Sequence, residues 1–184
     1  MLQLLGLCST DLAATEVAKR YGGHAWIAHS GEADTAPYHG MFAVATDDLE
    51  AATAAADVGL HLIFARTIKP AEASAPSDRV IASFGMVRHH SLTHRASDDH
   101  WRDIHGPLAL RCHLAMCDYQ QFSILATLSG AALDGMAMCA FPDRATLSAK
   151  FFNDDAAKAE IIADVSTFAD TRASLPRVVL TQAI

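Results

Sequence analysis

The amino-acid sequence predicts an α+β protein in which the element order β-α-β-β-α-β occurs twice. Short apolar or alternating runs, which are typical of strands, are separated by helical segments with polar caps, and this order recurs in both halves of the chain. Between the halves, residues 71–78 are small, polar and proline-bearing, as linkers often are. We therefore expect an N-terminal half at residues 1–70, a linker at residues 71–78 and a C-terminal half at residues 79–184.

The N-terminal half is expected to contain four strands and two helices. The strands are predicted at residues 2–8, 24–29, 38–45 and 60–68. Residues 9–11 can cap a helix that runs to about Arg20, where the following glycines end it. Residues 46–48 can cap an alanine-rich helix that runs to about Val58.

The C-terminal half repeats this order. Its strands are predicted at residues 80–88, 116–127, 134–141 and 177–182. Thr93 can cap a helix that runs through Trp101 to about Leu110, and two more helices are expected at residues 142–152 and 154–168. Two such halves predict a tandem ferredoxin-like fold, in which the open faces of two antiparallel sheets pack together around a cavity.

Composition and charge exclude several classes of function. The chain has 184 residues, 51% of them hydrophobic, and a formal net charge of −7, which argues against nucleic acid or an anionic membrane as a partner. No apolar run approaches the roughly 20 residues that span a bilayer, and the apolar start is interpreted as a strand. The four cysteines form no Cys-x-x-Cys pair, so we expect a protein of the reducing cytoplasm. Sheet edges that pair between chains could form a homodimer.

One stripe of the helix after Thr93 carries candidate acid/base groups. At helical spacing His94, Asp98, Trp101 and His105 fall within about 60° of one another. We predict His105, His94 and Asp98 as catalytic residues. The two histidines are separated by about 16 Å along a helix, so they would serve opposite ends of a long substrate, or only one of them acts. The same gap argues against a shared metal ion, and no metal is expected.

Five further residues are predicted to bind the substrate. Arg88 and His90 share one face at the end of a strand and could bind a phenolate. Trp101, Tyr119 and Phe152 are expected in the pocket wall, with His113, Phe151 and Phe168 as further wall candidates. Structural alternatives remain open for the polar residues. They are a helix-end bond for His105, an i, i+4 pair with Arg102 for Asp98, and a solvated strand edge for Arg88 and His90.

Several ordered motifs of the C-terminal half resemble those of the EthD family in the dimeric α/β-barrel superfamily. They are Leu92-Thr93, Trp101-Arg102, His105-Gly106-Pro107-Leu108, Leu133-Asp134-Gly135, Ala163-Asp164 and Phe168-Ala169-Asp170. The chain departs from the family pattern at Ser97, where an aromatic residue is usual, and at residues 89–91. The resemblance implies a barrel-type pseudo-dimer of ferredoxin-like halves, with the family histidine at His105 in the pocket.

The resemblance also implies a class of chemistry. Relatives include cofactor-free dehydratases, decarboxylases, cyclases and oxygenases that act on aromatic or polyketide-like compounds, and some superfamily members bind haem. We expect a cofactor-independent lyase of the dehydratase type, in which His105 moves a proton of a hydrophobic, hydroxylated aromatic molecule. The alternatives are an oxidative enzyme, either a cofactor-free oxygenase or a haem protein, and a non-catalytic accessory protein of aromatic degradation.

Overall fold

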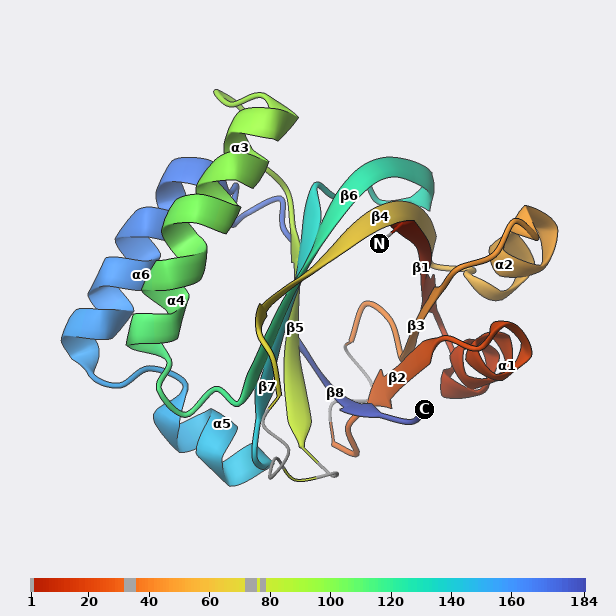
Figure 1. Cartoon of the computed structure of the whole chain (residues 1–184), viewed down its shortest axis with the longest axis horizontal. Helices are drawn as coiled ribbons and strands as arrows, with labels where there is room; N and C mark the ends of the chain where they lie inside the picture. Colours follow the sequence, from red (N-terminus) through yellow and green to blue (C-terminus); the bar gives the residue numbers. More distant parts are fainter. Residues whose placement is uncertain (1, 32–35, 72–75, 77–78) are drawn as a thin grey trace.

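Eight antiparallel strands form one closed barrel in the computed structural model, which describes residues 2–31, 36–71, 76 and 79–184 (Figure 1). The strands are β1 (Leu2–Cys8), β2 (His24–Ala28), β3 (Gly40–Val44), β4 (Gly59–Lys69), β5 (Val80–Met86), β6 (Asp118–Gly130), β7 (Gly135–Phe141) and β8 (Val178–Gln182). The helices are α1 (Asp11–Tyr21), α2 (Leu49–Ala55), α3 (His94–His100), α4 (Gly106–Cys112), α5 (Arg144–Lys150) and α6 (Asp155–Phe168). A π-helical segment, η2 (Trp101–His105), joins α3 to α4. The predicted α+β class is therefore confirmed.

The strand order around the barrel is β1-β3-β2-β8-β5-β7-β6-β4. The strands of the first half are contiguous, as are those of the second, and the halves meet edge to edge through β2–β8 and β4–β6. The sequence predicted two antiparallel sheets packed as a barrel-type pseudo-dimer, and the structure shows one continuous antiparallel sheet that closes into a barrel. Backbone hydrogen bonds join the two sheets into one, which removes the strand edges that a stacked pair would leave. A homodimer would have to use other surfaces, and it stays a prediction.

The barrel interior is filled by large apolar side chains. Alternate residues of each strand point inward, as the two-residue period of a strand requires. The buried interior cluster includes Leu5, Leu7, Trp26, Met41, Ile63, Phe122, Met136 and Leu180. The cavity that the sequence predicted between the faces of two sheets is thus largely filled by a packed apolar core.

The outer face of the barrel carries the helices. In Figure 1, α1 and α2 lie on one side, and α3, α4 and α6 lie on the other. The side chains that alternate with the interior set pack against these helices and form two further apolar clusters, one for each half. The cluster of the second half lies between the sheet and helices α4, α5 and α6. It borders the cavity described in the next section.

The helix predicted to run from Thr93 to Leu110 is interrupted. Thr93 caps α3 as expected, because its side chain accepts a hydrogen bond from Ala96 N–H. After the seven residues of α3 the chain widens at Trp101 into η2, where the Gly106 N–H donates to the Trp101 carbonyl. Pro107 supplies the cause, since it has no N–H and its ring would clash with the carbonyl four residues earlier in an α-helix. The predicted linker at residues 71–78 lies mostly outside the described residues. No described helix is both long enough and apolar enough to cross a membrane.

His61 on β4 predicts a loss of stability in acid. The side chain is fully buried, its Nδ1 lies 3.2 Å from Thr127 Oγ1, and its Nε2 has no partner in the described part of the chain. Burial lowers the pKa of His61 from 6.5 to about 4. Below pH 6.5 the unfolded chain binds a proton that the folded chain does not, so stability should fall as the pH drops toward 4, by on the order of 3 kcal/mol.

Urea unfolding of the wild type and of His61→Leu between pH 7 and pH 4 would measure this loss. The variant should lose markedly less stability over that range. His90→Leu serves as the control, because His90 is exposed and should leave the acid dependence unchanged. An identical pH dependence in the wild type and His61→Leu would contradict the assignment.

Candidate active site

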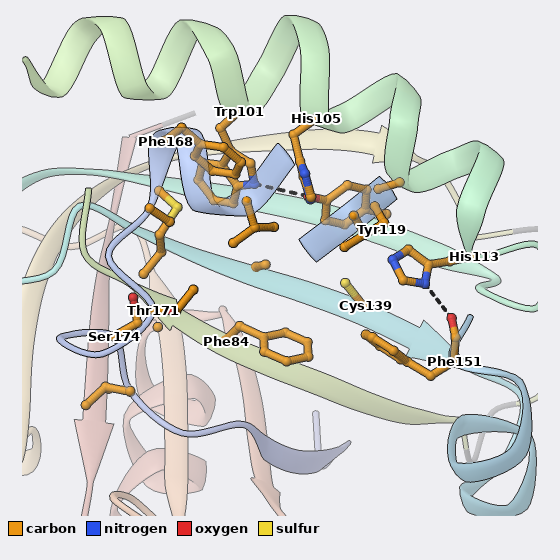
Figure 2. Close-up of a pocket in the computed structure, with 18 of the residues that line it drawn as sticks. Phe84, Trp101, His105, His113, Tyr119, Cys139, Phe151, Phe168, Thr171 and Ser174 are labelled. Carbon is orange, nitrogen blue, oxygen red and sulfur yellow. Dashed lines mark hydrogen bonds between the residues drawn. The ribbon is translucent and has the colours of Figure 1, made fainter. Parts of the chain in front are cut away.

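An apolar cavity of about 310 Å³ lies between the outer face of the sheet and the helices of the second half (Figure 2). Figure 2 shows Trp101, His105 and Phe168 on one side of this cavity and Phe84 on the opposite side. The sheet side is formed by the outward-facing residues of β5, β6 and β7, such as Tyr119 and Cys139. The candidate site is thus outside the barrel, and the expectation that it would lie between two sheets is corrected.

The histidine predicted from the helix stripe, His105, is one of the polar residues in this cavity. It is 9% exposed, and it sits at the last position of η2. Its Nδ1 donates a hydrogen bond of 2.8 Å to Oδ2 of Asp164 on α6. The other oxygen of the same carboxylate accepts a bond of 2.8 Å from Nε2 of His100, at the end of α3. One carboxylate therefore orients two imidazoles.

The ionised state of Asp164 fixes the tautomer of His105. Burial favours the neutral carboxyl, but the hydrogen bonds and charges of His105 and His100 outweigh it, so the net effect is a lowered pKa for Asp164. A carboxylate can only accept hydrogen bonds, so His105 Nδ1 must carry a proton. The neutral imidazole then has its lone pair on Nε2, the nitrogen that Asp164 does not engage. A histidine in this state can act as a general base.

A buried phenol stands beside the histidine. Tyr119 Oη accepts hydrogen bonds from Trp101 Nε1 at 3.2 Å and from Gln121 Nε2 at 3.0 Å. Burial raises the pKa of Tyr119 well above its ordinary value, so the side chain stays a neutral phenol. Both acceptor positions are in use, which leaves the hydroxyl hydrogen as the group that Tyr119 can offer to a ligand.

The other titratable residues of the cavity are uncharged near neutral pH. Burial lowers the pKa of His113, whose Nδ1 donates to the Phe151 carbonyl. Burial raises the pKa of the Cys139 thiol to about 12. No lysine, arginine, aspartate or glutamate is among the described residues that line the cavity. The site is therefore suited to a neutral, apolar molecule.

The structure brings together four of the eight site residues that the sequence predicted. His105, Trp101, Tyr119 and Phe152 line the cavity, as do the wall candidates His113, Phe151 and Phe168. Four others do not line it. They are His94, Asp98, Arg88 and His90.

The polar atoms of His94 and Asp98 are used in contacts with the barrel. His94 Nε2 donates to the Ile124 carbonyl at 2.7 Å. Asp98 forms a two-bond ion pair with Arg66 of β4, at 2.8 and 2.6 Å. The predicted stripe assumed a regular α-helix, and the π-helical turn after His100 changes the rotational relation between these residues and His105.

Arg88 and His90 likewise have other surroundings. Arg88 donates from Nε to the Leu92 carbonyl and forms a 3.5 Å ion pair with Asp134, so it braces the loop after β5. His90 is exposed, and its ring lies 4.3 Å from that of His89. Neither residue is placed to contact a ligand in the cavity.

Asp164 is the important residue whose role sequence reasoning missed. It was recognised as part of a family motif, but its partner His105 is 59 residues away, so no local spacing connects them. Gln121 was missed because a glutamine in a strand has no distinctive pattern. Among the described residues, no group of three histidine, cysteine, aspartate or glutamate side chains could hold a metal ion.

Gly135 allows the indole of Trp101 to reach the sheet. A Cβ at this position would lie 2.5 Å from Cζ3 of Trp101 and 3.1 Å from the Met86 methyl group. We expect Gly135→Ala to displace the indole and to lower stability by about 1–3 kcal/mol, as overpacking typically does. The measurement is thermal unfolding with near-ultraviolet circular dichroism. Gly31→Ala is the contrasting glycine variant: no atom lies within 4 Å of the added Cβ, but the positive φ of 104° strains an alanine, so stability should fall while the Trp101 signal stays unchanged.

Comparisons with known proteins agree with the motifs and the fold. The EthD domain family matches residues 89–172. A solved structure of an anthrone oxidase-like protein superposes with a TM-score of 0.60 at 11% identity, covering 100% of this chain and 91% of the other. A candidate monooxygenase from Fusobacterium nucleatum superposes with a TM-score of 0.53 at 9% identity, covering 100% of this chain and 92% of the other. No protein with a curated description matches. Residues 89–172, somewhat less than half of the chain, therefore match the EthD domain family whose motifs the sequence resembles.

Proposed function

We propose that this protein is an enzyme that deprotonates a neutral, fused-ring aromatic ketone at a ring CH₂ and lets the resulting carbanion react with dioxygen. The observation that carries this proposal is the Asp164–His105 pair at an apolar cavity of about 310 Å³. A base with a fixed tautomer, a neutral phenol and aromatic walls are what such a reaction requires of a protein. The names of the two similar structures, one oxidase-like and one a candidate monooxygenase, point to the same class of chemistry.

The proposed reaction begins with proton transfer to His105. Nε2 takes a proton from a ring CH₂ that a conjugated carbonyl across the same ring makes acidic, and the Asp164 carboxylate stabilises the imidazolium. The Tyr119 hydroxyl donates a hydrogen bond to the substrate oxygen on which the negative charge collects. Trp101 and Gln121 donate to Tyr119, which makes it a stronger donor.

Dioxygen is the oxidant in the second stage. The carbanion gives two electrons to dioxygen, a C–O bond forms, and the His105 imidazolium returns its proton to the peroxide. Loss of water from that hydroperoxide, with the second hydrogen of the same carbon, leaves a ketone. The CH₂ group and one dioxygen thus become C=O and one water, and His105 ends in its starting state.

The cavity favours this route over the dehydratase reaction expected from the sequence. Elimination of water needs an acid that protonates the departing hydroxide. Burial raises the pKa of Tyr119 and of Cys139 and lowers that of His113, so none of the three is a ready proton donor, and His105 would have to act as both the base and the acid of a dehydration. Oxygenation requires only one base and one hydrogen-bond donor, and the cavity holds both.

Haem does not fit the residues of this cavity. A haem group carries two propionates, which proteins usually pair with arginine or lysine, and no such residue is among the described lining residues. The volume of about 310 Å³ is also at the lower end of the range for small-molecule pockets. Haem therefore takes no part in the proposed reaction.

Oxygen uptake with anthrone as the probe substrate tests the proposal. The purified protein should consume one dioxygen per anthrone above the rate of spontaneous oxidation in buffer, and His105→Gln should reduce the reaction to that background rate. The quinone product should form only when dioxygen is present. Loss of water from a hydroxylated aromatic substrate under anaerobic conditions, at a rate that depends on His105, would instead establish a dehydratase.

We also propose that the barrel is a pseudo-dimer of two ferredoxin-like units at residues 1–70 and 79–184. Two observations support this. Each half has the element order β-α-β-β-α-β, and the strands of each half take the spatial order fourth, first, third, second. In this arrangement the second unit carries the candidate site, and the first completes the barrel and supplies Arg66 to Asp98.

A further inference from the structure

A second cavity, of about 120 Å³, lies on the inner side of the sheet. Its lining residues face into the barrel and come from one end of β2, β6, β7 and β8 and from the start of β5. The sheet separates it from the candidate active site. On β7, for example, Met138 lines the inner cavity and its neighbour Cys139 lines the outer one. The inner cavity is therefore a distinct site that the proposed reaction does not use.

A buried carboxylate with one unused oxygen faces this cavity. Asp118 is 6% exposed, and its Oδ1 has no hydrogen-bond partner in the described part of the chain. Its Oδ2 accepts only a long bond of 3.4 Å from Gln120 Nε2. A buried acceptor without a partner is unfavourable, so this oxygen is well placed to accept a hydrogen bond from a ligand.

A partly exposed arginine beside it has an unused donor. Arg79 Nη2 lies 3.8 Å from Asp118 Oδ2 and donates a 3.3 Å bond to Gln182 Oε1. Its Nε is buried and has no partner among the described residues. Arg79 and Asp118 therefore form only a loose ion pair, in which each side chain keeps one hydrogen-bonding atom free for a third group.

We propose that this barrel-mouth cavity binds a small, neutral, planar molecule with a carboxamide group. The ligand carbonyl accepts from Arg79 Nε–H, and the ligand N–H donates to Asp118 Oδ1. A carboxamide offers one acceptor and one donor side by side, and it leaves the opposite charges of Arg79 and Asp118 balanced. The ring of Trp26 lines the same cavity and gives a planar ligand an aromatic wall. Since a single water molecule needs roughly 10–15 Å³ on this scale, about 120 Å³ accommodates a ligand of several heavy atoms.

The two tryptophans of the chain make the test specific, because each cavity contains one of them. Trp26 lines the barrel-mouth cavity and Trp101 lines the candidate active site. Their indole N–H signals in a ¹⁵N–¹H spectrum are assigned with Trp26→Phe and Trp101→Phe. Benzamide is then titrated into the full-length protein, and we expect a saturable shift of the Trp26 signal.

The binding should depend on the side chains of Arg79 and Asp118. The double variant Arg79→Met/Asp118→Leu replaces the ion pair with apolar side chains, a change that buried pairs usually tolerate, and it should abolish the Trp26 shift. Arg95→Met, at an arginine whose side chain is 92% exposed, is the matched control and should bind like the wild type. Unchanged dispersion of the amide signals establishes that each variant is folded.

Three results would overturn the proposal. They are an unsaturable or absent Trp26 shift with benzamide, a Trp26 shift that survives in the folded double variant, and equal or tighter binding of benzoate or benzylamine, which would mean that the site selects a charged ligand. Oxygen uptake with anthrone is measured on the same variants. Because neither residue touches the candidate active site, the double variant should retain that activity, so failure of one proposal is distinguishable from failure of the other.

Discussion

Replacing His105 with glutamine is expected to lower kcat for the proposed oxygenation by about 10²–10⁴-fold, the usual contribution of one positioned general base. Glutamine is similar in size and can still donate a hydrogen bond to Asp164, but it cannot accept a proton at neutral pH. The apolar walls stay in place, so KM should change much less than kcat. The measurement is initial-rate kinetics of oxygen uptake over a range of anthrone concentrations.

His90→Gln is the matched control for this experiment. It makes the same substitution in the same C-terminal half of the chain, but at an exposed histidine that does not line the cavity. Its kinetics should match those of the wild type, and thermal unfolding of both variants separates loss of catalysis from loss of fold. A His105→Gln protein that is folded and turns over substrate at the wild-type rate would remove His105 from the mechanism.

Much of the fold follows from local patterns in the sequence. Thr10 and Thr93 accept the hydrogen bonds expected of helix caps, and the strand predicted at residues 134–141 forms β7, with Met138 inside the barrel and Cys139 outside. Closure of the barrel does not follow from such patterns. Closure depends on pairing between β4 and β6 and between β2 and β8. The sequence of a strand specifies the two-residue alternation of its side chains, but it does not specify which other strand it pairs with.

The candidate site was predictable only in part, for a related reason. Helical spacing and the family motif both identified His105, and the side chain does line the cavity. The same spacing also selected His94 and Asp98, whose polar atoms meet the Ile124 carbonyl and Arg66 instead. A prediction from regular α-helical spacing cannot include the π-helical turn that Gly106 and Pro107 impose. It also cannot include the strands that pass under α3. Residues brought together by tertiary contacts, such as Asp164 and His105, carry no signal in their spacing.

Replacing Asp164 with asparagine is the second large effect that we expect, a fall in kcat of about 10²–10⁴-fold. Asparagine keeps the size of the side chain but removes the charge that stabilises the imidazolium. Its amide can also present an N–H to His105 Nδ1, which would move the ring proton to Nε2 and block the basic nitrogen. Oxygen-uptake kinetics measure the effect, and NMR of the imidazole nitrogens reports the tautomer of His105 directly.

The variant His100→Gln distinguishes two roles of Asp164: orienting the His105 base, and holding the helices together. His100 bonds to the same carboxylate as His105, at the same distance of 2.8 Å, but it does not line the cavity. If Asp164 acts by fixing and charging the His105 imidazole, His100→Gln should lower stability while leaving the His105 tautomer and most of kcat intact. If instead the carboxylate only holds α6 against α3, the two variants should lose activity in proportion to their loss of stability. A kcat for Asp164→Asn equal to that of His100→Gln, at equal stability, would therefore refute the assignment of Asp164 as the residue that orients the base.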